Sequence, residues 1–159
     1  MASGLIGEAI LIIASVIVAG SVAGVVLSQI GVFESSITQT SESQKDKLLT
    51  KIKIVYATNS SDNDVNIYVK NIGKQPLTSL DNMDVYFGPV NSADRYAYVE
   101  QTWQDDTWEF NSTSTPSVWQ SMETQQIDIN ESSLAKSTTY EIQVTTPQGV
   151  SDEYIFSIP

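Results

Sequence analysis

The chain has 159 residues, which is enough for one ordinary domain and one additional segment. It contains neither cysteine nor histidine, so disulfides, thiolate nucleophiles, imidazole bases and the usual zinc ligands are excluded. Its formal net charge of −11 argues against a nucleic-acid partner, whose phosphates require a basic surface. Because the sequence also carries no catalytic triad and no phosphate-binding loop, we predict that the protein is not an enzyme and uses no cofactor or metal.

The most apolar part of the sequence lies near its N-terminus. Residues 9–27 read AILIIASVIVAGSVAGVVL and contain no charged side chain. As a helix, this stretch is about 28 Å long, close to the roughly 30 Å hydrocarbon thickness of a bilayer. A helix that is apolar on every side must be buried in lipid or among other helices. We predict a helix over residues 1–30 that contacts the membrane or neighbouring helices through residues 5–30.

A cleaved secretory signal is the alternative interpretation of this segment. Such signals place a basic region before an apolar stretch of about 7–15 residues and end at a small-residue cleavage site. The only charged residue before the apolar stretch is Glu8, and the stretch is longer than a signal requires. The composition therefore favours a retained anchor.

Small residues follow one stripe of the apolar helix. Gly20, Gly24 and Ser28 recur at intervals of four, and small side chains at this spacing let two helix backbones approach closely. Glycine and alanine are frequent in membrane helices in general, which is the alternative explanation. We predict that these three residues form a helix-packing face.

The next segment, residues 31–50, reads GVFESSITQTSESQKDKLLT. Phe33, Ile37 and Leu48 lie near one helical face, and polar side chains occupy most positions between them. We predict a polar helical stalk over residues 31–50.

Residues 51–159 alternate apolar and polar side chains with a period of two, which is typical of half-buried strands. Turn-forming clusters such as NSSDND, NIGKQP and TPQGV separate the apolar runs. The strand candidates are residues 52–56, 65–69, 83–87, 95–101, 107–110, 126–129, 139–145 and 154–158. Seven or eight short strands without helical periodicity predict an all-β sandwich of immunoglobulin-like architecture over residues 51–159.

All three tryptophans fall within a single short segment of loop-like composition. Trp103, Trp108 and Trp119 are each explained by burial in a core, but three together also suggest a protein interface, where tryptophan is enriched. We keep both interpretations and name the three residues as candidates for an interface.

Three Asn-x-Ser/Thr sequences begin at Asn59, Asn111 and Asn130. A chain this rich in serine and threonine produces such sequences by chance, so their number is not informative. Because they lie in turn-like segments, they are candidate N-glycosylation sites if the domain is extracellular.

Three parts of the sequence carry a resemblance to a known family. They are the N-terminal MASGLIGEAILIIASVIVAGSVAGVV, the strand and turn IYVKNIGKQPL, and the C-terminal hairpin YEIQVTTPQGVSDEY. Together they resemble the archaellum accessory proteins of the FlaG type, relatives of archaellins and type IV pilins. The resemblance implies a helix in the archaeal cell membrane, an extracytoplasmic sandwich and a stator-like role in the motility machinery. It also implies a FlaF-type partner and, through it, contact with the surface layer.

The alternative is a pilin-like subunit that assembles into a filament through its N-terminal helix. In that case Glu8 would neutralise the terminal amine of a neighbouring subunit, whereas otherwise it is a carboxylate in the first turn of a helix, favoured there by the helix dipole. Processed archaellins and pilins carry basic residues before the cleavage glycine, and no Lys or Arg precedes this helix. The sequence therefore favours the accessory role, and we expect self-association in either case. An anchored domain that binds carbohydrate or envelope protein is a third, weaker interpretation.

Overall fold

The computed structural model describes residues 2–100, 104–111 and 116–158. Two compact units follow one another along the chain, residues 1–43 and residues 44–159. The first unit is helical, and the second contains the last turns of the same helix together with the whole sheet.

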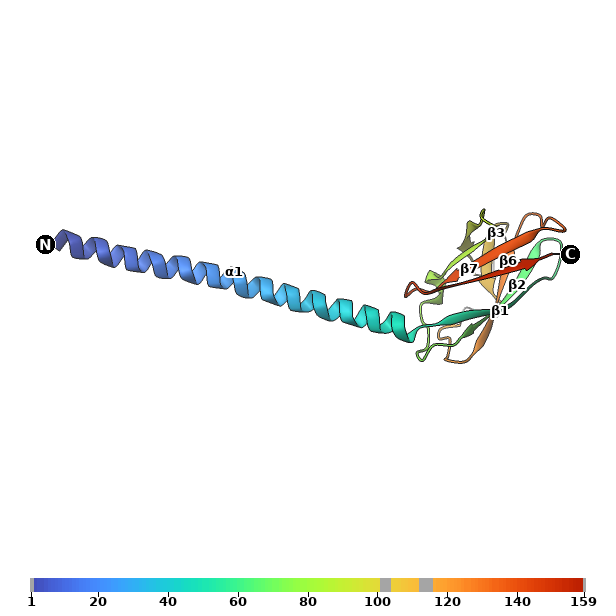
Figure 1. The fold of residues 1–159 in the computed structure, drawn as a ribbon, viewed down its shortest axis with the longest axis horizontal. Coiled ribbons are helices and arrows are strands. Elements are labelled where there is room, and N and C mark those ends of the chain that lie inside the picture. The colour runs from blue at the N-terminus through green and yellow to red at the C-terminus, as the bar shows by residue number, and fades with distance from the viewer. Residues whose placement is uncertain (1, 101–103, 112–115, 159) are drawn as a thin grey trace. The chain divides into compact units, whose positions relative to one another are not determined.

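The helix α1 (Ala2–Leu49) runs without interruption through Gly31 (Figure 1). Large apolar side chains such as Leu11 and Ile17 are more than 60% exposed along it. Within the described residues, α1 is the one helix long and apolar enough to cross a membrane. The hydroxyls of Ser15 and Ser21 donate to carbonyls four residues earlier, over 2.7 and 2.9 Å, so the polar groups in the apolar stretch are satisfied inside the helix.

Eight strands follow the helix. They are β1 (Ile52–Asn59), β2 (Asp64–Asn71), β3 (Asp84–Pro89), β4 (Asp94–Tyr98), β5 (Thr107–Phe110), β6 (Thr124–Asn130), β7 (Thr139–Thr145) and β8 (Ser151–Ser157), with a short 3₁₀ helix η1 (Leu80–Asn82) before β3. Their order in the sheet is β1-β2-β6-β5-β4-β3-β7-β8. Every neighbouring pair is antiparallel except β4 and β5, which run parallel.

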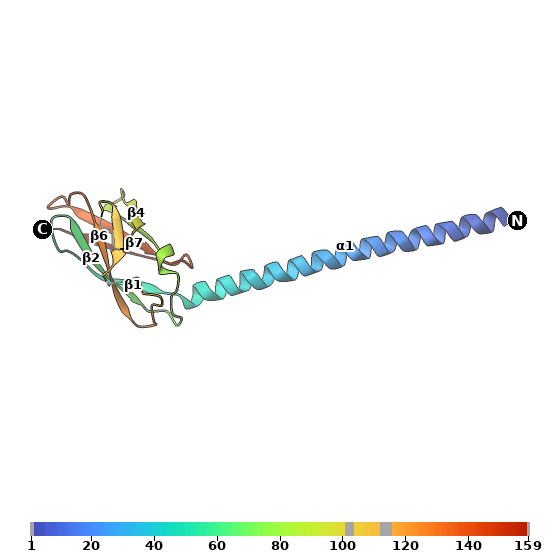
Figure 2. The ribbon, with the colours of Figure 1, turned by 180° about the vertical axis from the view of Figure 1, so that it is seen from behind.

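The sheet curves back on itself, so its first and last strands come together (Figures 1 and 2). Asp152 on β8 joins these edges, because its carboxylate accepts from the Lys53 ammonium at 3.0 Å and from the Ile54 amide at 2.7 Å. The result is a nearly closed sandwich with one side-chain-mediated seam, which leaves little free edge for unwanted strand pairing.

The inward-facing side chains form one continuous core. Residues of β2 alternate between partly exposed and buried positions, and Val65, Ile67 and Val69 are fully buried. An aromatic chain crosses the core from Tyr98 through Trp108 and Phe110 to Trp119, with successive ring centroids 4.8, 5.4 and 6.3 Å apart. These spacings fall in the range in which aromatic pairs add to burial energy.

The predicted fold class, an N-terminal helix followed by an all-β sandwich, is confirmed. The strand candidates match the observed strands to within a few residues at each end. The parallel pairing of β4 with β5 was not predicted, because it depends on contacts between segments that the local pattern does not relate.

We expect Trp108→Ala to lower the free energy of unfolding by about 3–5 kcal/mol, because a fully buried indole is replaced by a cavity. The control is Ile155→Ala, at a side chain 51% exposed, which should change stability by no more than about 0.5 kcal/mol. Urea unfolding followed by the fluorescence of the remaining tryptophans measures both. Equal losses in the two variants would contradict the assignment of Trp108 to the core.

Candidate functional site

The last turn of α1 is fastened to the sheet by a turn that follows β2. The Lys74 amide donates to the Leu49 carbonyl at 2.8 Å, and the Ile72 amide donates to the Lys51 carbonyl at 2.8 Å. The final carbonyls of a helix have no partner inside the helix, so the first of these bonds also caps α1. All of these residues belong to the same compact unit.

Asn71 organises this turn and is completely buried. Its side-chain oxygen accepts from the Gly73 amide at 2.9 Å, and its side-chain nitrogen donates to the carbonyls of Gln75 and Trp119 at 3.0 and 3.2 Å. An asparagine that bonds the backbone two residues ahead replaces a backbone turn with a side chain. Because the oxygen and the nitrogen of the Asn71 side-chain amide both have hydrogen-bond partners, burying this side chain leaves no polar atom unsatisfied.

Gly73 permits the helix end to approach the turn. A Cβ atom placed on Gly73 would lie 2.6 Å from the Leu49 carbonyl oxygen and 2.7 Å from the Lys51 backbone nitrogen. Both neighbours are backbone atoms, so no flexible side chain can yield. The sequence NIG was recognised as a turn, but its role in holding the helix was missed, since an Asn-x-Gly pattern does not say which backbone approaches the glycine.

The predicted helix-packing residues lie on the exposed surface of α1. Gly20, Gly24 and Ser28 are exposed, and a Cβ placed on either glycine would meet no atom within 4 Å. Glu8 is exposed on the same helix. Helix association through the small residues and the role of Glu8 in assembly stay predictions.

The tryptophan prediction is corrected by the structure. Trp108 and Trp119 are completely buried, and the indole nitrogen of Trp119 donates to the Glu123 carbonyl at 3.0 Å. Neither ring offers surface to a partner, so the core interpretation holds for these two residues. Trp103 lies outside the described residues.

The three sequons occupy different environments. Asn59 ends β1 and is partly exposed, and Asn111 follows β5 and is exposed. The Asn111 side chain donates to the Asp128 carboxylate at 2.7 Å, while residues 112 and 113 of its sequon lie outside the described residues. Asn130 ends β6, is only 6% exposed and lies between its strand partners Asp64 on β2 and Thr107 on β5, so the folded domain leaves no room for a glycan there. Asn130 is therefore removed as a candidate, and the other two stay predictions.

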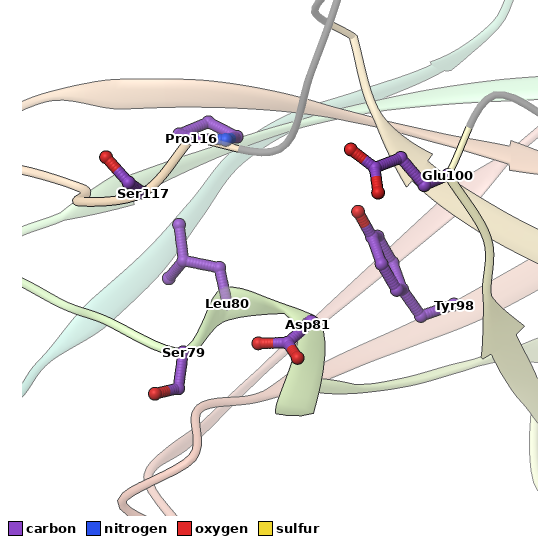
Figure 3. Close-up of a pocket in the computed structure, with 7 residues that line it drawn as sticks. All are labelled: Ser79, Leu80, Asp81, Tyr98, Glu100, Pro116 and Ser117. Atoms are coloured by element: carbon purple, nitrogen blue, oxygen red, sulfur yellow. The ribbon is translucent and has the colours of Figure 1, made fainter.

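An open pocket of about 590 Å³ lies beside the aromatic chain (Figure 3). Its described lining consists of Ser79, Leu80, Asp81, Tyr98, Glu100, Pro116 and Ser117. The Tyr98 hydroxyl points toward Glu100, and η1 supplies Leu80 and Asp81 from the opposite wall (Figure 3). The two carboxylates and the hydroxyls make this pocket polar and acidic.

Two titratable groups with raised pKa values lie elsewhere in the sandwich, the buried Tyr96 and the half-buried Asp128. Burial raises the pKa of Tyr96, and its hydrogen bond to the Glu131 carboxylate raises that pKa further, so the hydroxyl stays a donor. Burial also raises the pKa of Asp128, against the opposing effect of hydrogen bonds from Gln126 and Asn111. Among the described residues, no group of three acidic side chains is arranged to hold a metal ion. The Tyr96 hydroxyl and the Asp128 carboxylate therefore act as hydrogen-bonding parts of the sheet.

With helix, sandwich and junction defined, comparison with known proteins gives the class of protein. The family model of archaeal-type flagellin matches residues 2–156, so the chain belongs to the archaeal-type flagellin family. Among solved structures, it is similar to the archaellum periplasmic stator protein FlaG from Sulfolobus acidocaldarius. The two are 34% identical with a TM-score of 0.60, over 68% of this chain and 100% of the other.

Two further structures are similar. The stator protein complex of FlaF and FlaG from Sulfolobus acidocaldarius matches at 34% identity and a TM-score of 0.59, over 68% of this chain and 90% of the other. The archaeal flagellum of Methanospirillum hungatei matches at 12% identity and a TM-score of 0.63, over 95% of this chain and 92% of the other, which shows a shared fold. No curated protein sequence matches the chain.

We expect Gly73→Ala to destabilise the C-terminal unit by about 1–3 kcal/mol, because the new methyl group overlaps two backbone atoms. The matched control is Gly31→Ala, where a Cβ meets nothing within 4 Å and alanine favours the helix by about 1 kcal/mol. Amide hydrogen exchange should show faster exchange at Ile72 and Lys74 in the first variant only. Unchanged exchange at both amides would contradict a tight junction.

Proposed function

We propose that this protein is a structural component of the archaellum, anchored in the cell membrane, with a stator-like role. The observation that carries the proposal is the 34% identity to FlaG, a periplasmic stator protein, over the full length of that structure. The long apolar helix supports anchoring, since its exposed apolar side chains require lipid or other helices. The sandwich would then lie on the extracytoplasmic side.

A FlaF-type protein is the proposed partner of the sandwich. The basis is the similarity to FlaG in a structure that contains both FlaF and FlaG. Contact with the surface layer would follow through that partner. We propose no enzymatic activity, because the similar solved structures are a stator protein, its complex and an archaeal filament.

A filament subunit is the second candidate. It is favoured by the match to the archaeal-type flagellin model and by the similarity to the archaeal flagellum over 95% of this chain, which includes the helix. In that case the stripe of Gly20, Gly24 and Ser28 would pack against other helices in a filament core. The lower identity of 12%, compared with 34% for FlaG, places this candidate second.

Shearing filaments from cells distinguishes the two functions. We expect the protein to stay in the membrane fraction, because a stator component is held in the envelope and a filament subunit leaves with the filament. Quantitative mass spectrometry of the sheared filaments and the cell bodies measures the partition, with the major filament protein as internal control. Recovery in filaments in amounts comparable to that protein would overturn the stator role and support the filament subunit.

Protease treatment of intact cells tests the proposed orientation. In cells stripped of their surface layer, trypsin should cleave at Lys45 and Lys47, which are exposed on α1, and should release the sandwich. A cytoplasmic protein must stay intact in the same sample. A fully protected sandwich that becomes cleavable only after cell lysis would show the opposite orientation.

A further inference from the structure

Positive charge is concentrated at one end of the sandwich. Of the eight basic residues in a chain of net charge −11, six fall between Lys45 and Lys74. We define the lysine cluster as the five that the fold brings to the junction with α1, namely Lys47, Lys51, Lys53, Lys70 and Lys74. Of the three remaining basic residues, Lys45 lies on α1, and Arg95 and Lys136 each pair with an aspartate.

Strand pairing, backbone hydrogen bonds and one side-chain contact bring the cluster together from separate segments. Lys53 on β1 lies directly opposite Lys70 on β2, and the Lys51 carbonyl accepts from the turn after β2. The Lys74 amide is bonded to the end of α1, and the side chain of Lys47 reaches the turn between β7 and β8, beside Gly149. Helix, strands and turns therefore place their lysines at a single end of the domain.

Four of the five lysines in the cluster have no ion-pair partner among the described residues. Lys53 pairs with Asp152, but no ion pair within the described residues involves Lys47, Lys51, Lys70 or Lys74. Directly opposite like charges on neighbouring strands, as at Lys53 and Lys70, destabilise a sheet. A group of lysines without ion-pair partners, on a chain that is otherwise acidic, forms a local positive patch that is suited to recognising a negatively charged partner.

We propose that the lysine cluster binds a carboxylate-rich surface of a separate protein. Lysine presents compact, hydrated charges that suit the rim of such an interface. Lipid headgroups are the less favoured source of negative charge. Residues 28–49 correspond to about 33 Å of helix, several times the screening length of about 8–10 Å at physiological salt. The lysine cluster would bind such a surface whether or not the partner is of the FlaF type.

The probe is short fluorescent poly-L-glutamate, added to the full-length protein in nonionic detergent and followed by anisotropy. We expect binding that weakens between about 50 and 200 mM salt. The double variant Lys70→Gln and Lys74→Gln should weaken it about fourfold or more, at roughly twofold to fivefold per exposed ion pair. The control, Arg95→Gln with Lys136→Gln, makes the same change in net charge at paired positions and should alter binding less than about twofold. Cooperative thermal unfolding of each double variant verifies that it is folded.

Lysine footprinting locates the contact. In phosphatidylcholine vesicles, poly-L-glutamate should slow acetylation of Lys70 and Lys74 and leave Lys136 unchanged. Three results would overturn the proposal: no binding at low salt, equal weakening in the two double variants, or protection by added phosphatidylglycerol without the peptide. Protection that rises with protein concentration alone would also overturn it, because a second copy would then supply the carboxylates.

Discussion

The approach of two backbones at Gly73 is the constraint on which the rest of the domain depends. Because Gly73 has no side chain, the turn after β2 lies against the end of α1, where it donates one amide to Leu49 and a second to Lys51, just beyond the helix. Asn71 then ties the same turn to the segment that contains Trp119, whose ring belongs to the core. Helix cap, turn and core are therefore coupled through a few neighbouring residues, and a change at any of them affects all three.

Charge has two separate roles around this junction. Asp152 joins the first and last strands, so a carboxylate closes the sandwich where a ladder of backbone bonds is absent. The unpaired lysines add nothing comparable to stability, because exposed charges contribute little to folding. Their grouping in an acidic chain is better explained by what they meet outside the domain.

Much of the fold followed from local pattern, while the site did not. Alternation along residues such as Val65, Ile67 and Val69 reports a buried face directly, so the strands were predicted nearly in place. Strand order and the parallel pair of β4 and β5 depend on long-range contacts that alternation does not encode. Composition could not separate core from interface for Trp108 and Trp119, because both environments favour the same side chain. The role of Gly73 needed the position of Leu49, which is remote in sequence.

The order of the junction bonds along the chain has a mechanical consequence. Tension arriving through the backbone of α1 meets the bond at Leu49 first and the bond at Lys51 next, before it reaches Ile52 and the β1–β2 ladder. Those two hydrogen bonds, together with the buried Asn71, therefore bear tension before the β1–β2 ladder does. Load applied along the chain is thereby taken up at the junction before it can shift the register of the β1–β2 ladder.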